Sequence, residues 1–206
     1  MSLGGREPTD RLDWAVASEP FPGETESGDS HIVRTMADGV LVAAVDALGH
    51  GREAAPVTRC AVAALMSWRG GALDALVRHC HRALIGTRGV VLSVATFDAR
   101  EDRLSWLGVG NIRGSLLRWD RSLVSVRAEL VERHGIVGLG LPSLRISTVP
   151  VRRGDLLVLA TDGIRRGYIH RMGWMARPQQ LADRILADYA SGVDDALVLV
   201  ARYRGA

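Results

Sequence analysis

The feature that most constrains the fold is a long stretch, residues 89–161, that reads as strand after strand with no helical period. The strand-like runs are GVVLSVATFD, RLSWLGVG, RGSLLRWD, SLVSVRAELVER, LRISTVPV and DLLVLAT. Turn residues punctuate them, as at Asp98–Asp102 and Asp120-Arg121. Because parallel strands need long crossover connections, these short links indicate antiparallel pairing.

The segments on either side of this stretch complete the pattern. HIVRTM and GVLVAAV are two strands joined at Ala37-Asp38-Gly39, a hairpin signal. Two helical faces follow within residues 52–85, separated by Gly70-Gly71. A helix over residues 178–190 precedes a last strand, ALVLVARY. This order predicts an α+β layered sandwich and disfavours a doubly wound βαβ fold, in which strands and helices would alternate.

Composition narrows the class of protein. The 206 residues are 47% hydrophobic and 24% charged, which is typical of a globular chain, and no apolar run is long enough to cross a bilayer. The net charge of +3 comes from scattered arginines with few aromatic neighbours, so we expect no nucleic-acid partner. We expect a flexible tail over residues 1–11, one domain over residues 12–206, a cytoplasmic location, no membrane association and a monomer.

Four aspartates lie where an apolar strand meets a turn. Asp29 precedes HIVRTM, Asp46 closes VLVAAV, Asp162 follows LLVLAT and Asp194 opens the last strand. Since the start of one antiparallel strand lies beside the end of its neighbour, the four can converge on one edge of a sandwich. Clustered carboxylates repel one another unless a proton or a cation neutralises them, and oxygen ligands suit Mg²⁺ or Mn²⁺.

Each aspartate also has an ordinary alternative. Aspartate is common in turns, and the TDG at Thr161–Gly163 could be a tight turn with no further role. We expect Asp102, Asp120 and Asp155 to be turn residues of this kind. The residues alone leave both interpretations open.

Five motifs, taken together, favour the metal site. They are SGD (Ser27–Asp29), VDALGHG (Val45–Gly51), GVGN (Gly108–Asn111), ATDGI (Ala160–Ile164) and VDDALVLVAR (Val193–Arg202). In this order and spacing they resemble the metal-dependent serine/threonine protein phosphatases of the type 2C (PPM) family, in the bacterial SpoIIE-like branch. The resemblance covers residues 12–202. GVGNIR followed by GIVGLGLP, in a short chain, is most similar to the RsbX-type feedback phosphatases of the stressosome.

The resemblance implies a four-layer αββα sandwich, two antiparallel sheets flanked by helices, with two Mn²⁺ or Mg²⁺ ions at one end. Asp46 would bridge the ions and Ala47 would offer its backbone carbonyl to one of them. Asp162 and Asp194 would bind the second ion, and Asp29 would contribute directly or through water. Asp46 and Asp162 would act catalytically through the metal-bound water, which attacks phosphorus in line.

Other positions carry supporting roles by the same resemblance. Residues expected to support the site structurally are Gly49, Gly51, Gly110, Asn111 and Gly163. Arg165 or Arg166 could bind phosphate or the partner protein, although exposed arginines are as often merely solvated. Two positions depart from the family: Ala47 stands where glycine is usual, and His50 lies too deep in its turn for the general acid proposed in eukaryotic enzymes. We therefore assign His50 no catalytic role.

The substrates implied are phosphoserine or phosphothreonine residues of STAS-domain stressosome proteins. A second possibility within the same enzyme class is a single-domain anti-sigma-factor antagonist. A catalytically inactive binding module with the same fold is the alternative from another class, and the intact set of four aspartates counts against it.

Overall fold

The protein forms two antiparallel sheets of five strands with helices on their outer faces. The computed structural model describes residues 11–98, 100–120, 123–170 and 172–205, so residues 1–10 of the tail expected over residues 1–11, and the expected turn residue Arg121, lie outside the description. The strands are β1 (Leu12–Glu19), β2 (Asp29–Met36), β3 (Gly39–Ala47), β4 (Val90–Asp98), β5 (Arg103–Val109), β6 (Arg113–Asp120), β7 (Leu123–Glu129), β8 (Ser147–Pro150), β9 (Leu156–Ala160) and β10 (Ala196–Tyr203). The helices are α1 (Gly51–Ser67), α2 (Leu73–Ala83) and α3 (Pro178–Tyr189), with a 3₁₀ turn at Tyr168–His170.

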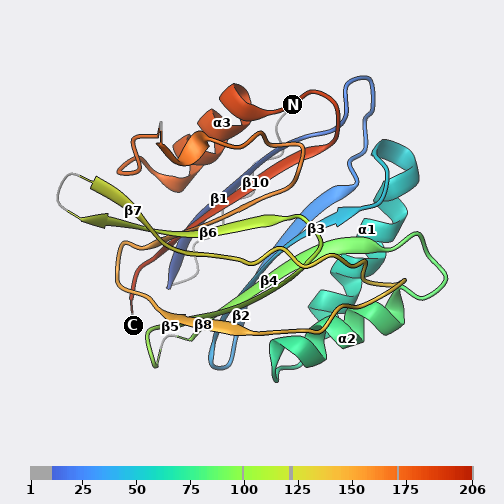
Figure 1. Ribbon diagram of the computed structural model, residues 1–206, viewed down its shortest axis with the longest axis horizontal. Helices are drawn as coiled ribbons and strands as arrows, with labels where there is room; N and C mark the ends of the chain where they lie inside the picture. Colours follow the sequence, from blue (N-terminus) through green and yellow to red (C-terminus); the bar gives the residue numbers. More distant parts are fainter. Residues whose placement is uncertain (1–10, 99, 121–122, 171, 206) are drawn as a thin grey trace.

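Four layers stack in the order helix, sheet, sheet, helix (Figure 1). One sheet has the strand order β1-β10-β9-β6-β7 and carries α3 on its outer face; the other has the order β2-β3-β4-β5-β8 and carries α1 and α2. Separate clusters of buried side chains fill the space between the sheets and the space under each helical layer. The predicted αββα sandwich is confirmed.

The central strands are apolar on both faces because both faces are covered. All five residues of β9, LLVLA, are buried, and so are the first six of β10. A strand that packs on a second sheet with one face and on a helix with the other needs no polar alternation. β9 therefore carries no charged residue, and the aspartates next to it lie beyond its two ends, one of which is the candidate site.

The helix break predicted at Gly70-Gly71 is confirmed. Both glycines have positive φ, 122° and 117°, which residues with a side chain rarely adopt, and α1 ends three residues before Gly70. None of the helices in the described ranges is long and apolar enough to cross a membrane.

Candidate metal centre

Strand pairing in the sheet β2-β3-β4-β5-β8 brings two of the aspartates together. In the register of β2 with β3, Asp29 lies opposite Asp46. The hairpin turn lies at the far end of these strands, so their other ends, which carry the aspartates, are open to the surface. Asp29 is buried and Asp46 is partly buried.

The other two aspartates lie at adjacent strand ends of the sheet β1-β10-β9-β6-β7. Asp162 follows β9 by two residues and Asp194 precedes β10 by two residues, and β9 pairs with β10 in an antiparallel register that places Ala160 opposite Val198. Asp162 is exposed and Asp194 is partly buried. The convergence expected from strand ends is therefore present within each sheet.

Thr161 joins the two pairs across the sandwich. Its hydroxyl donates a hydrogen bond to Asp29 Oδ2 at 2.7 Å and accepts one from the Leu197 backbone N–H at 2.9 Å. The Thr161 side chain is fully buried. This contact fixes the end of β9 in one sheet against the start of β2 in the other, so that all four aspartates belong to one edge.

Mutual repulsion and burial perturb these carboxyls. Burial, followed by the charges of Asp162 and Asp194, raises the pKa of Asp46 from 3.8 to about 8. Burial, then the charge of Asp46, raises the pKa of Asp29, although the Thr161 hydrogen bond opposes this. The pKa of Asp194 is raised by burial first and by Asp162 among other charges, while nearby His50 lowers it. The carboxyls are therefore close enough to oppose one another's ionisation.

The donor set fits hard divalent cations. In the described part of the chain, the arginine ion pairs within 4.0 Å involve other acids and none reaches Asp29, Asp46, Asp162 or Asp194. Carboxylate oxygens are the ligands that Mg²⁺ and Mn²⁺ prefer. However, no three His, Cys, Asp or Glu side chains among the described residues stand at ligand spacing. Asp29 Oδ2 accepts a hydrogen bond from Thr161 and Asp162 Oδ2 accepts one from Asn111, which leaves the other oxygen of each carboxylate outside these two contacts.

Asp195 has a different role from its neighbour Asp194. It is buried, and its carboxylate accepts three backbone N–H groups: Phe21 at 2.7 Å, Gly28 at 2.7 Å and Gly51 at 2.9 Å. Gly51 begins α1, whose N-cap residue His50 makes no side-chain cap. Asp195 thus takes the place of a local cap, satisfying an N–H in the first turn and complementing the positive end of the helix dipole. It joins α1 and the loop before β2 to the site.

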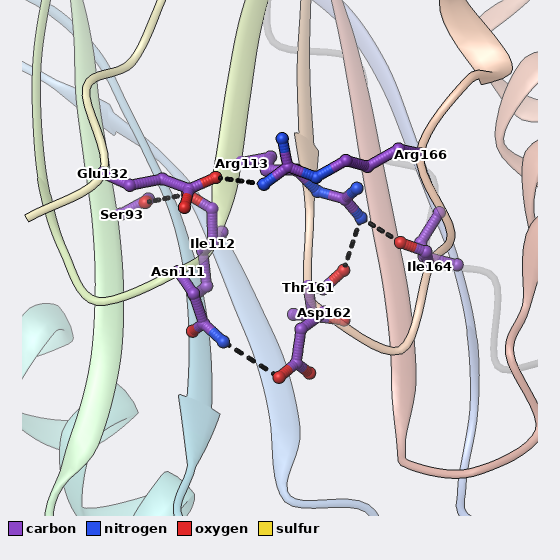
Figure 2. Close-up of polar contacts among 9 residues, drawn as sticks. All are labelled: Ser93, Asn111, Ile112, Arg113, Glu132, Thr161, Asp162, Ile164 and Arg166. Atoms are coloured by element: carbon purple, nitrogen blue, oxygen red, sulfur yellow. Dashed lines mark hydrogen bonds and ion pairs between the residues drawn. The ribbon is translucent and has the colours of Figure 1, made fainter. Parts of the chain in front are cut away.

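The side of the site next to Asp162 contains an amide and three arginines. Asn111 Nδ2 donates to Asp162 Oδ2 at 2.9 Å, and the Arg113 guanidinium donates to the backbone carbonyls of Thr161, at 3.2 Å, and of Ile164 (Figure 2). Asn111 and Arg113 thereby hold the turn that carries Asp162. A pocket of about 250 Å³ opens here, and Arg113, Arg165 and Arg166 line it together with Asp162.

The two arginines expected to bind substrate differ in their contacts. Arg165 donates to the backbone carbonyl of Asp188 at 3.0 Å, whereas Arg166 pairs with Glu132 at 3.2 Å. Both line the pocket, so their geometry is compatible with a role toward an anion, which stays a prediction.

The structure gives a physical reason for two of the expected supporting glycines. A Cβ on Gly163 would lie 2.0 Å from the Asp195 carbonyl oxygen, and Gly110 has a φ of 99° with Val91 packed against it. Gly49 and Gly51 also have positive φ. Ala47, where the family has glycine, is absent from the positive-φ residues of the described chain, so its alanine side chain is unstrained. The ring of His50 stacks on Phe21 with centroids 4.2 Å apart.

Sequence reasoning missed Arg113, Thr161, Asp195 and Glu132 as parts of this site. Thr161 and Arg113 flank motif residues, Asp162 and Asn111, and this adjacency was a usable signal. Asp194 and Asp195 both precede β10, which begins at Ala196, so strand alternation gave no signal to separate their roles. Glu132 carries no such signal, because it follows β7 in a loop whose path depends on tertiary packing.

Comparisons with known proteins agree with the fold and identify the family. The family described as Stage II sporulation protein E (SpoIIE) matches residues 37–204. No curated protein sequence matches the chain. A structure reported under "The bacterial stressosome: a modular system that has been adapted to control secondary messenger signaling" is 28% identical with a TM-score of 0.81, over 93% of this chain and 99% of the other.

Two further structures share the fold at lower identity. RsbX in complex with magnesium is 16% identical with a TM-score of 0.83, over 98% of this chain and 100% of RsbX. The catalytic domain of the serine/threonine protein phosphatase PstP, in complex with two manganese ions, is 20% identical with a TM-score of 0.72, over 94% of this chain and 99% of the domain.

Proposed function

Since the chain belongs to the SpoIIE family, whose members are protein serine/threonine phosphatases of the PP2C type, we propose that it hydrolyses phosphoserine or phosphothreonine on protein partners with two divalent cations, Mn²⁺ or Mg²⁺, as cofactors. One observation carries the proposal: four aspartates from both sheets meet at one edge, and in the described structure no arginine pairs with them. Their repulsion is relieved when cations bind. RsbX and PstP, which share this fold, were crystallised with magnesium and with two manganese ions.

We assign the ligands as follows. Asp46 would bind both ions, the Ala47 carbonyl would bind one of them, Asp162 and Asp194 would bind the second, and Asp29 would contribute directly or through water. The cations would supply positive charge to the phosphoryl oxygens and make a nearby water easier to deprotonate.

The chain's own residues prepare this edge. Asn111 fixes the orientation of the Asp162 carboxylate by donating to Oδ2, and Arg113 holds the backbone on either side of Asp162. The Thr161 hydrogen bond holds Asp29 in position between the sheets. Arg165 and Arg166 line the adjacent pocket, where they would bind the phosphorylated segment of the partner. The enzyme needs no covalent intermediate and hence no nucleophilic cysteine.

The partners we propose are phosphorylated STAS-domain proteins of a bacterial stressosome or partner-switching system, acting in the cytoplasm. The support is the 28% identity to the structure reported under the stressosome title and the shared fold of RsbX. The fold also matches a Mycobacterium tuberculosis protein that contains RsbU and RsbW domains, at 19% identity.

The test is phosphate release from a phosphoserine STAS protein with Mn²⁺, with a chelator, and with the variants Asp46→Asn and Asp162→Asn. We expect either variant, or the chelator, to lower kcat/KM by about 100-fold or more, since even residues outside the ligand shell can contribute that much. The matched control is Asp38→Asn, which removes an exposed carboxylate from the hairpin turn at the other end of the strands. Activity that survives chelation, or survives in both variants, would overturn the metal assignment.

A catalytically inactive module is the competing proposal. It predicts tight binding to the phosphorylated STAS protein without phosphate release at any Mn²⁺ or Mg²⁺ concentration. Measuring binding and release on the same preparation separates the two.

A further inference from the structure

A second pocket adjoins the one beside Asp162. It has a volume of about 220 Å³ and extends past Ser115 toward Tyr168 and His170. Three residues, Arg113, Glu132 and Arg166, line both pockets. These three side chains therefore form the boundary between the two hollows, and β6 runs along both of them.

Of the three side chains at this boundary, Arg113 is held in place, whereas Arg166 and Glu132 form an ion pair that can open. Arg113 is half-buried and tied to two backbone carbonyls, so it is part of the wall. Arg166 and Glu132 meet at 3.2 Å with their side chains 78% and 38% exposed (Figure 2). An ion pair this exposed contributes only about 0–1 kcal/mol. Another carboxylate can therefore replace Glu132 at Arg166 at little cost in free energy.

Opening the pair would join the two pockets into one groove that starts at the candidate metal centre. Such a groove would be lined by arginine and glutamate side chains, would extend over both pockets, and would begin where the phosphorylated side chain must enter. These properties suit an extended polypeptide better than a compact small molecule. The Glu132 carboxylate already shows which chemical group Arg166 accepts.

We propose that the two pockets together bind the polypeptide flanking the phosphorylated residue, and that Arg166 binds an acidic side chain of that polypeptide in exchange for Glu132. The proposal rests on the proposed phosphatase function and deepens it, since it names a sequence preference of the substrate. Arg166 is then a specificity residue, and Glu132 is a competitor carried by the enzyme itself.

The experiment uses phosphoserine peptides with an otherwise neutral sequence, in which one glutamate is moved through the positions on either side of the phosphoserine. The readout is the ratio of kcat/KM for each glutamate peptide to that of the neutral parent, so each variant serves as its own reference. For the wild type we expect a ratio of about 2 at one or more positions, which is less than a full exposed ion pair contributes because Glu132 competes for Arg166. Arg166→Ala should bring the ratio to about 1, and Glu132→Gln should raise it above the wild-type value.

The most discriminating experiment exchanges the charges of Glu132 and Arg166. The double variant Glu132→Arg with Arg166→Glu keeps an ion pair of the same composition, so it should fold as the wild type does. The preference should now turn to peptides with arginine at the same position. Asp38→Asn, which removes the partner of Arg100 in another exposed ion pair, should leave the wild-type ratio unchanged.

A ratio that persists in Arg166→Ala, or that fails to rise in Glu132→Gln, would overturn the groove assignment. So would a wild type with no preference at any position. If the wild type releases phosphate from neither the peptides nor an aryl phosphate, the proposed function fails instead. The groove is then tested by labelling these peptides with a fluorophore and measuring their affinity for the wild type and Arg166→Ala. The ratio of the affinity of a glutamate peptide to that of the neutral parent should follow the pattern expected above for kcat/KM.

Discussion

The two ends of strand β9 carry acidic residues in opposite electrostatic settings. Asp155, just before the strand, accepts two hydrogen bonds from the Arg118 guanidinium at 2.8 and 2.5 Å and one from the Arg152 backbone N–H. Its side chain is 2% exposed and that of Arg118 is 14% exposed. Asp162, just after the strand, joins three other aspartates with which no described arginine pairs. One end of the strand is neutralised within the chain, whereas the other depends on protons or on added cations.

The difference teaches how this fold separates stability from function. A buried carboxylate that serves the fold has its charge compensated by a fixed partner, as Asp155 does, because an uncompensated buried charge is costly. At the other end, burial first and then the charges of the neighbouring aspartates raise the pKa of Asp46 to about 8, so in the absence of cations the ionisation of this carboxyl opposes folding. Removing a carboxylate should therefore have opposite effects on stability at the two ends.

The largest effect is expected from Asp155→Asn. Arg118 would lose this carboxylate, and removing one member of a buried ion pair costs about 3 kcal/mol of unfolding free energy. Urea unfolding with a chelator measures it. The stabilisation produced by Mn²⁺ should be unchanged, because the metal centre lies at the other end of the strand. A variant as stable as the wild type would show that the Arg118 pair contributes nothing net.

Asp46→Asn should do the reverse. With a chelator the variant should be at least as stable as the wild type, because it lacks one of the repelling carboxylates. In the wild type, Mn²⁺ at about 100 times its Kd should add about 2.7 kcal/mol. This increment should vanish in Asp46→Asn and persist in Asp155→Asn, as thermal unfolding with and without Mn²⁺ would reveal. An Mn²⁺ increment equal in all three proteins would mean that the ion binds elsewhere.

The contrast between the two ends was only half predictable from sequence. Strand ends are local features, and antiparallel pairing relates them by a simple rule, so the convergence of Asp29, Asp46, Asp162 and Asp194 could be inferred. Asp155 is a turn residue as expected, since its N–H donates to the Arg152 carbonyl and its carboxylate accepts the Arg152 N–H, but the sequence did not predict its ion pair with Arg118. Its partner Arg118 lies 37 positions away on β6, and the contact depends on the pairing of β6 with β9, which no local pattern specifies. For Asp102 the turn expectation holds, with a φ of 48°.

The pH dependence of stability sharpens the comparison further. The pKa of Asp46 is raised on folding from 3.8 to about 8, so the folded state binds its proton more tightly than the unfolded state. The resulting stability is fully present below the unfolded pKa and is lost as pH rises toward about 8. With a chelator, the wild type should lose about 2 kcal/mol more than Asp46→Asn between pH 5 and pH 8.5, less than the full linkage value because the carboxylates can turn toward solvent.

With Mn²⁺ the sign should reverse, since the ligands must be deprotonated to bind the ion. Urea unfolding of both proteins at the two pH values, with and without Mn²⁺, measures the four conditions for each protein. Parallel pH profiles for the wild type and Asp46→Asn in chelator would contradict the shift.

The smallest effect concerns Asp195, which borders the cluster yet resembles Asp155 in having its hydrogen bonds satisfied. In Asp195→Asn the amide oxygen can still accept two N–H groups, but the amide nitrogen cannot accept the third, so one buried donor among Phe21, Gly28 and Gly51 is left unsatisfied. The net cost is about 1 kcal/mol, because the loss of a charge from the repelling group offsets part of the penalty. Hydrogen exchange of the Gly51 amide at the start of α1 should accelerate while amides in β9 stay protected. Uniform acceleration would instead mean that Asp195 stabilises the whole fold, as Asp155 does. Asp195 would then be a structural residue and no part of the metal-dependent cluster.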